Sequence, residues 1–173
     1  MIAETLFGEH NPGGKLTVTF PKSVGQIELN FPFKPGSHGS QPKSGPNGSG
    51  ATSVSAFAYS DLEVSPLRQR TQGEYTVKVN VTNTGKRAGD EVVQLYVRDK
   101  VSSVITYDSQ LRGFERISLK PGETRQVTFS LKPEDLQILD RNMNWTVEPG
   151  EFEVMIGASS QDIRLKKTIT ALP

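Results

Sequence analysis

The sequence that decides the fold is residues 75–97, YTVKVNVTNTGKRAGDEVVQLYV. In its first part every second residue is apolar, from Tyr75 to Val81, and the residues between them are mostly polar. The same spacing returns from Val93 to Val97. Because successive side chains of a β-strand point to opposite faces, this pattern predicts two strands that each bury one face. The polar, glycine-containing stretch between them predicts a surface connection.

Shorter runs of the same kind flank this stretch on both sides. They predict further strands over residues 58–64, 111–119, 126–131, 151–156 and 163–169. A bulge is expected near Gly113. Pro121-Gly122 and Pro149-Gly150 each predict a type II turn, and Pro133–Leu136 predicts one short helical turn. Several short strands without a long helix predict that residues 56–173 form an all-β domain, a β-sandwich.

The first 55 residues differ in composition. Residues 1–33 contain a helix end before Gly8 and one short strand at 16–20, which is too little regular structure to bury their apolar side chains. Residues 34–55 are rich in Gly, Pro and Ser and are predicted to form a linker, because they cannot bury enough apolar area to offset their ordering entropy. A loop ordered against a partner surface is the alternative.

The composition excludes several classes of function. The 173 residues include 20 Lys and Arg against 19 Asp and Glu, so the net charge of +1 argues against a nucleic-acid partner. No apolar stretch approaches the length of a membrane span, and the start lacks the pattern of a signal peptide. The chain has no cysteine and only two histidines, His10 and His38, for which we expect structural or solvent-exposed roles. No metal or cofactor is therefore expected.

Hydrolysis by a pair of carboxyl groups, one acting as an acid and the other as a base or nucleophile, needs the two about 5 to 10 Å apart across one bond. The carboxylates weighed for this role are Asp90, Glu91, Glu115, Glu134, Asp135, Glu148 and Glu151. Adjacent side chains on a strand diverge, acidic residues at the start of a helix are ordinary, and the others flank a tight turn or lie on an exposed strand. None is assigned as catalytic. Trp145 is expected to pack in or beside the core, with sugar stacking as the alternative.

Longer motifs in the sequence resemble a known family. They are residues 81–97 quoted above, LRGFERI (111–117), LKPGET (119–124), VEPGEF (147–152) and IGASS (156–160). Together they resemble the fibronectin type III-like domain at the C-terminus of glycoside hydrolase family 3, an immunoglobulin-like sandwich. LFG (6–8), NPGGKL (11–16), TFP (19–21) and VGQ (24–26) are similar to the end of the family's α/β sandwich domain.

The resemblance implies that the chain is the C-terminal part of a β-glucosidase or related β-glycosidase. The family's nucleophile and acid/base have no matching position here, and a Pro-Phe-Gly-Tyr-type segment is missing between about Val54 and Ala56. The expected role is a non-catalytic, stabilising domain whose partner is the catalytic region. The candidate interface to that region is Leu6, Phe7, Val18, Phe20, Phe31 and Phe33.

Two other functions remain open at this stage. One is a free-standing module that binds glycans or another protein, and the other is an active hydrolase. The resemblance implies a periplasmic or secreted parent enzyme, although the sequence itself leaves the localisation and the sugar specificity undetermined.

Overall fold

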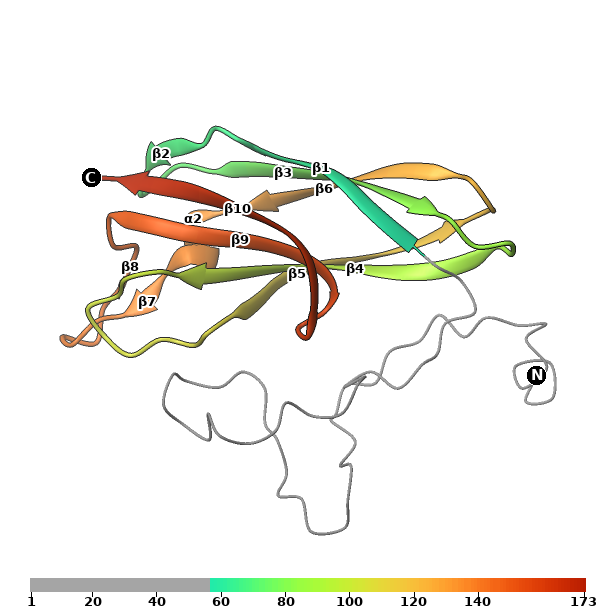
Figure 1. The fold of residues 1–173 in the computed structure, drawn as a ribbon. Helices are drawn as coiled ribbons and strands as arrows, with labels where there is room; N and C mark the ends of the chain where they lie inside the picture. The colour runs from blue at the N-terminus through green and yellow to red at the C-terminus, as the bar shows by residue number, and fades with distance from the viewer. Residues whose placement is uncertain (1–56) are drawn as a thin grey trace, which may run out of the picture.

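The computed structural model describes residues 57–173, which form a sandwich of two β-sheets (Figure 1). The smaller sheet has the strand order β1 (Phe57–Ser65), β3 (Tyr75–Asn83), β6 (Thr124–Leu131). The larger sheet has the order β2 (Arg68–Arg70), β10 (Asp162–Leu172), β9 (Gly150–Ser159), β4 (Gly89–Asp99), β5 (Gln110–Leu119). Strands β2 and β10 pair in parallel, and all other pairs in the two sheets are antiparallel.

A short helix and a small hairpin lie beside the sandwich. The helix α2 (Pro133–Leu136) has Pro133 in its first turn, and the side chain of Asp135 accepts a hydrogen bond from the backbone of Lys132 at 2.9 Å. The hairpin pairs β7 (Ile138–Leu139) with β8 (Trp145–Thr146). Figure 1 shows both at the end of the sandwich where β10 finishes.

The core lies between the two sheets and is filled by the apolar faces of the long strands. Val77, Val79 and Leu131 are fully buried, and Tyr75 is buried with its hydroxyl donating to the carbonyl oxygen of Thr170 at 3.0 Å. This bond satisfies the one polar group of a large core side chain and ties the two sheets together.

The seven long strands confirm the sequence prediction of an all-β sandwich. The predicted bulge is also present, because Leu95 pairs with Gly113 while its neighbour Tyr96 pairs with Leu111, which leaves Arg112 as the extra residue. The three short strands β2, β7 and β8 were not predicted, since two or three residues carry no readable period.

One predicted turn is correct and the other is wrong. Gly122 has φ +74°, as a type II turn after Pro121 requires. Gly150 does not have a positive φ and instead begins β9, where it pairs with Ala171. Pro149 therefore precedes a strand rather than opening a turn of that type.

The outer face of the larger sheet is less polar than its alternation suggests. Tyr96 and Met155 alternate with core residues and belong to the outward face, where they are cross-strand partners. Both are nevertheless buried, at 3% and 4% exposure. The predicted segments 1–33 and 34–55 lie outside the described residues.

Candidate interaction surface

The carboxylates considered for catalysis make structural contacts. Asp90 and Glu91 lie on opposite faces of β4, as expected from their adjacency. Asp90 accepts hydrogen bonds from Arg116 and from the hydroxyl of Ser118, while Glu91 is buried at 6% exposure and accepts the amide N–H of Val92 at 3.0 Å. Two carboxylates that point apart cannot flank one glycosidic bond.

Most of the remaining acidic candidates also make structural hydrogen bonds or ion pairs. Glu148 accepts the amide N–H of Ser103 at 2.9 Å, and Glu151 pairs with Lys100 at 3.0 Å. Asp135 caps α2, and Glu134 and Glu115 are exposed. These contacts stabilise loops and helix ends, as surface carboxylates commonly do in proteins.

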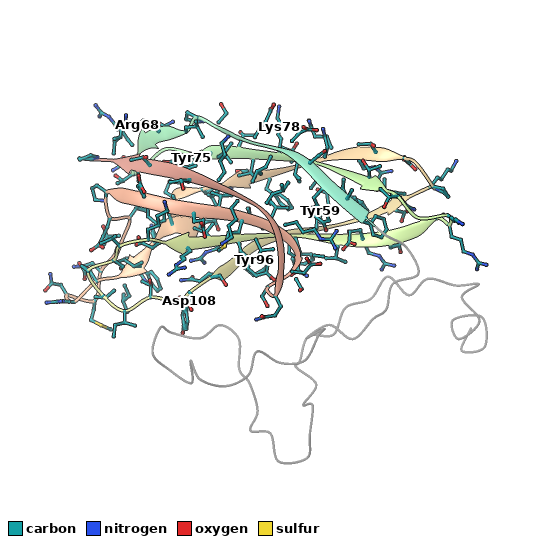
Figure 2. The ribbon with its side chains drawn as sticks, viewed as in Figure 1. Tyr59, Arg68, Tyr75, Lys78, Tyr96 and Asp108 are labelled. Carbon is teal, nitrogen blue, oxygen red and sulfur yellow. The ribbon has the colours of Figure 1, made fainter. Side chains whose placement is uncertain are left out.

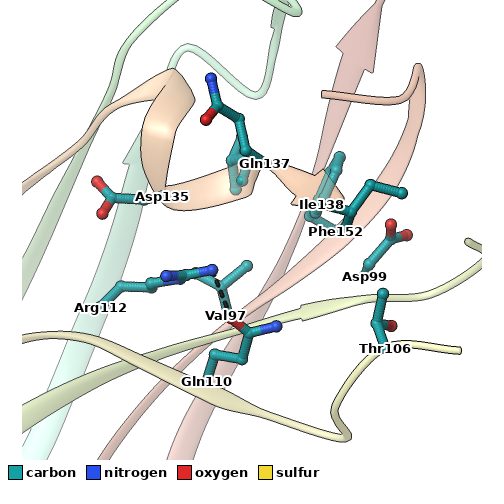
Figure 3. Close-up of a pocket in the computed structure, with 10 residues that line it drawn as sticks. Val97, Asp99, Thr106, Gln110, Arg112, Asp135, Gln137, Ile138 and Phe152 are labelled. Carbon is teal, nitrogen blue, oxygen red and sulfur yellow. Dashed lines mark hydrogen bonds between the residues drawn. The ribbon is translucent and has the colours of Figure 1, made fainter. Parts of the chain in front are cut away.

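A small pocket lies between α2 and the larger sheet (Figure 3). Its volume of about 10 Å³ is room for about one water molecule and far too small for a sugar ring. Burial raises the pKa of Asp99 and lowers the pKa of Arg112, which donates to the side chain of Gln110 at 2.5 Å. The pocket is therefore a small gap in the packing between α2 and the larger sheet.

Neither a metal centre nor a membrane span is found in the part of the chain that the structure describes. No three His, Cys, Asp or Glu side chains of residues 57–173 gather as a metal site would require. Over the same residues no helix has the length and hydropathy to cross a bilayer. His10 and His38 lie outside these residues.

Trp145 was predicted to pack in or beside the core, and the structure does not bury it. It begins β8, pairs with Leu139, and is 68% exposed. The hairpin is a two-residue ladder at the end of the sandwich, so its Trp side chain has no facing sheet to pack against.

Most of the exposed large apolar side chains of the described residues come from two stretches of the chain. Seven of the eight lie in residues 101–114 or in the hairpin loop and β8, and the eighth is Leu67. We call these seven the apolar flank: Val101, Ile105, Tyr107, Leu111, Phe114, Met143 and Trp145. Such a concentration of apolar surface marks an interaction site more often than scattered exposed residues do.

Two hydrogen bonds hold the loop between β4 and β5 against the segments around the hairpin. Arg141 of the hairpin loop donates to the carbonyl oxygen of Ser103 at 3.2 Å, and the amide of Ser103 donates to Glu148, which follows β8, at 2.9 Å. Figure 2 labels Asp108, which lies in the same β4–β5 loop, at the lower edge of the sandwich.

Strand β5 supplies the central residues of the apolar flank. Phe114 lies opposite Gln94 and is 69% exposed, whereas Leu111 lies opposite the buried Tyr96 and is 44% exposed. Tyr96 lies on the same face as Leu111, and burial raises the pKa of its hydroxyl to about 12. Met155 is the partner of Tyr96 on the next strand.

Three cations beside the apolar flank form ion pairs within the domain. Arg98 pairs with Asp108 at 3.7 Å, Arg116 pairs with Asp90, and Lys100 pairs with Glu151. An apolar centre with a polar margin is the usual anatomy of a protein interface.

The comparisons with known proteins match this architecture. The family model described as "Fibronectin type III-like domain" matches residues 91–160, which run from β4 to β9. The sandwich is a fibronectin type III-like domain. A β-xylosidase of Formosa agariphila is 43% identical over 95% of this chain and 24% of its own length. A periplasmic β-glucosidase of Salmonella typhimurium is 38% identical over 94% of this chain and 23% of its own.

Solved structures agree with these relatives. The β-glucosidase of Listeria innocua in complex with glucose superposes with a TM-score of 0.82 at 27% identity, over 99% of this chain and 26% of that one. A β-glucosidase involved in saponin metabolism from intestinal bacteria gives 0.85 at 34% identity, over 99% and 24%. The chain spans about a quarter of the curated relatives it matches and is similar to the C-terminal part of family 3 glycosidases.

The interface predicted from the sequence and the apolar flank do not overlap. The predicted residues Leu6, Phe7, Val18, Phe20, Phe31 and Phe33 lie outside the described residues, so their role stays a prediction. The apolar flank was missed because strand alternation assigns residues to faces without saying what covers each face. Its one sequence signal was the run of apolar residues in the loop between Val101 and Ile105.

Proposed function

We propose that this chain is the non-catalytic, stabilising C-terminal domain of a β-glycosidase of family 3. The observation that carries the proposal is the asymmetry of the alignments, which cover 94–98% of this chain but 20–27% of the curated relatives. All eight are named as β-glucosidases or β-xylosidases. The parent reaction is accordingly the release of a terminal β-linked glucose or xylose.

The carboxylates of the sandwich support a non-catalytic role. The two adjacent acids on β4 point to opposite faces, and those near the hairpin bind backbone amides or lysine. A glycosidase pair needs both carboxyls to face one cleft. The catalytic groups belong to the remaining three quarters of the parent polypeptide, whose compartment in the Salmonella typhimurium relative is the periplasm.

The experiment is an assay of the purified 173-residue chain on aryl β-glucoside and aryl β-xyloside substrates. We expect no turnover above buffer. Turnover that is abolished by a single substitution such as Glu91→Gln or Asp135→Asn, with the fold intact by circular dichroism, would overturn the proposal.

A second candidate function, glycan binding, is favoured by the exposure of Trp145. An exposed aromatic ring can stack on a sugar face, and Trp145 is the only tryptophan of the chain. Its fluorescence therefore reports binding without a label. A saturable change on adding β-linked gluco- or xylo-oligosaccharides, lost in Trp145→Ala, would establish this function, and an unchanged spectrum would exclude Trp145 as the platform.

A further inference from the structure

We propose that the apolar flank is the surface by which this domain docks onto a neutral, apolar protein surface of the parent glycosidase, with Phe114 and Leu111 at the centre of the contact. The proposal rests on the proposed function and adds which part of the domain surface makes the contact. It places the contact on one outward face and one end of the sandwich, rather than around the whole domain.

The first argument is that the two outward faces differ. The outer face of the smaller sheet is polar and internally bonded, with Thr82 and Thr124 hydroxyls 2.7 Å apart and Gln126 donating to Asn80 at 3.4 Å. The outer face of the larger sheet carries Phe114 and Leu111 instead. Water solvates the first face well, whereas the second gains free energy when another protein covers it.

The second argument is the apolar neighbourhood of Leu111. Its cross-strand partner on the same face is Tyr96, the partner of Tyr96 on the next strand is Met155, and both of these side chains are buried. An aromatic anchor surrounded by packed apolar groups is typical of the few residues that dominate an interface. Phe114, at 69% exposure, has the most apolar area still to bury among these.

The third argument identifies the class of occupant. A nucleic acid or an anionic membrane requires cations that are free to pair with phosphate. Of the basic residues beside the flank, Arg98, Lys100 and Arg116 are paired with carboxylates within the domain. The other two, Arg112 and Arg141, donate hydrogen bonds to Gln110 and to the carbonyl oxygen of Ser103. A neutral protein surface needs no such cations, and the remaining part of the relatives' polypeptide is tethered to this region at high effective concentration.

The fourth argument is directed against a second copy of this chain. Strand β5 is an edge strand, and edge strands can pair with their own kind. Here the bulge at Arg112 interrupts the edge, and Glu115 and Arg116 follow Phe114 directly. Bulges and charged residues are the usual protection against edge-to-edge association.

The test uses a chimera in which this chain replaces the matching region of the Salmonella typhimurium β-glucosidase. In that enzyme Phe114→Ser and Leu111→Ser should each raise the rate of thermal inactivation about tenfold, as expected for central interface residues. Leu67→Ser is the matched control, because Leu67 is 47% exposed but lies outside the flank. It should leave the inactivation rate unchanged.

The isolated 173-residue chain separates docking from folding. Phe114→Ser and Leu111→Ser should leave its melting temperature within about 2 °C of the parent chain, because exposed residues contribute little to the domain's own stability. A large fall in this melting temperature would show that the residues serve the fold and would overturn the proposal.

Three further outcomes distinguish the proposed function, the docking surface and self-association of the chain. If the unsubstituted chimera is inactive and unfolded, the proposed function fails and the docking proposal with it. If the chimera is active but indifferent to both substitutions, only the docking proposal fails. A dimer of the isolated chain in light scattering that Phe114→Ser dissociates would assign the flank to a second copy.

Discussion

At the scale of single residues, Asn83 holds two turns of the sandwich together. Its side chain is completely buried and donates to the carbonyl oxygens of Arg87 at 2.8 Å and Leu119 at 3.0 Å. Its side-chain oxygen accepts the amide of Gly85 at 2.9 Å, and its backbone bonds to the turn at Gly122. One amide side chain thus joins the β3–β4 connection to the end of β5.

Replacing Asn83 by Leu should destabilise the domain by about 2–3 kcal/mol, because one buried and two partly buried backbone groups lose their partner. The free energy of unfolding from urea titration measures this. Asn142→Leu is the control, since Asn142 is an exposed residue of the hairpin loop and should change stability by no more than about 0.5 kcal/mol. Equal effects of the two substitutions would show that the Asn83 network carries no net stability.

Gly157 should not tolerate even one added carbon. A Cβ there would lie 2.2 Å from the carbonyl oxygen of Asp162, whereas a Cβ on Gly150, on the same strand, would meet nothing within 4 Å. We expect Gly157→Ala to cost about 1–3 kcal/mol and Gly150→Ala to be close to neutral. Thermal unfolding of both variants measures the contrast, and similar melting temperatures would contradict it.

At the scale of elements, the long strands could be predicted from the sequence, whereas what packs against their outward faces could not. Strand β3 buries every second residue from Tyr75 to Val81, so its alternation can be read directly. Tyr96 and Met155 obey the same alternation and yet are buried on the outward face. The two-residue repeat of a strand tells on which face of the sheet a side chain lies. Whether that side chain is buried depends on what packs against the face.

The hairpin shows the same limit for an exposed residue. Trp145 was expected in or beside the core, since tryptophan is highly buried on average. Its strand has only two residues and lies at one end of the sandwich, so no opposing sheet reaches it. The apolar flank escaped prediction for the complementary reason, since three of its seven residues lie in a loop that has no period to read.

The buried tyrosines of β1 and β4 should make the sandwich sensitive to alkali. Burial raises the pKa of Tyr96 to about 12, and burial together with the charge of Glu91 raises that of Tyr59. An unfolded tyrosine titrates near pH 10. The stability contributed by these raised values is therefore fully present below about pH 10 and is lost as the pH rises through about 12.

Urea titrations from about pH 8 to 12 measure this loss. Tyr96→Phe should flatten the alkaline fall in the free energy of unfolding, because the substitution removes one raised pKa. The same substitution should remove one late-titrating phenolate from the ultraviolet absorbance curve. An unchanged curve would mean that burial does not raise the pKa of Tyr96.

At the scale of the whole molecule, the core is complete within the described residues. One continuous cluster of twenty buried side chains runs from Phe57 to Ala171. We expect residues 57–173, expressed alone, to unfold in one cooperative transition within about 5 °C of the full chain. Calorimetry of both would test this, and a transition without cooperativity would show that residues 1–56 complete the core.

The order in which the strands are made has a consequence for biosynthesis. Strand β10 lies between β9 and β2, and Arg68 of β2 pairs with Thr170, which the ribosome adds about a hundred residues later. The larger sheet therefore cannot close while β10 is still inside the exit tunnel. A product that stops before Asp162 would display an open sheet edge to proteases and chaperones, so the cell can recognise incomplete copies by the missing strand.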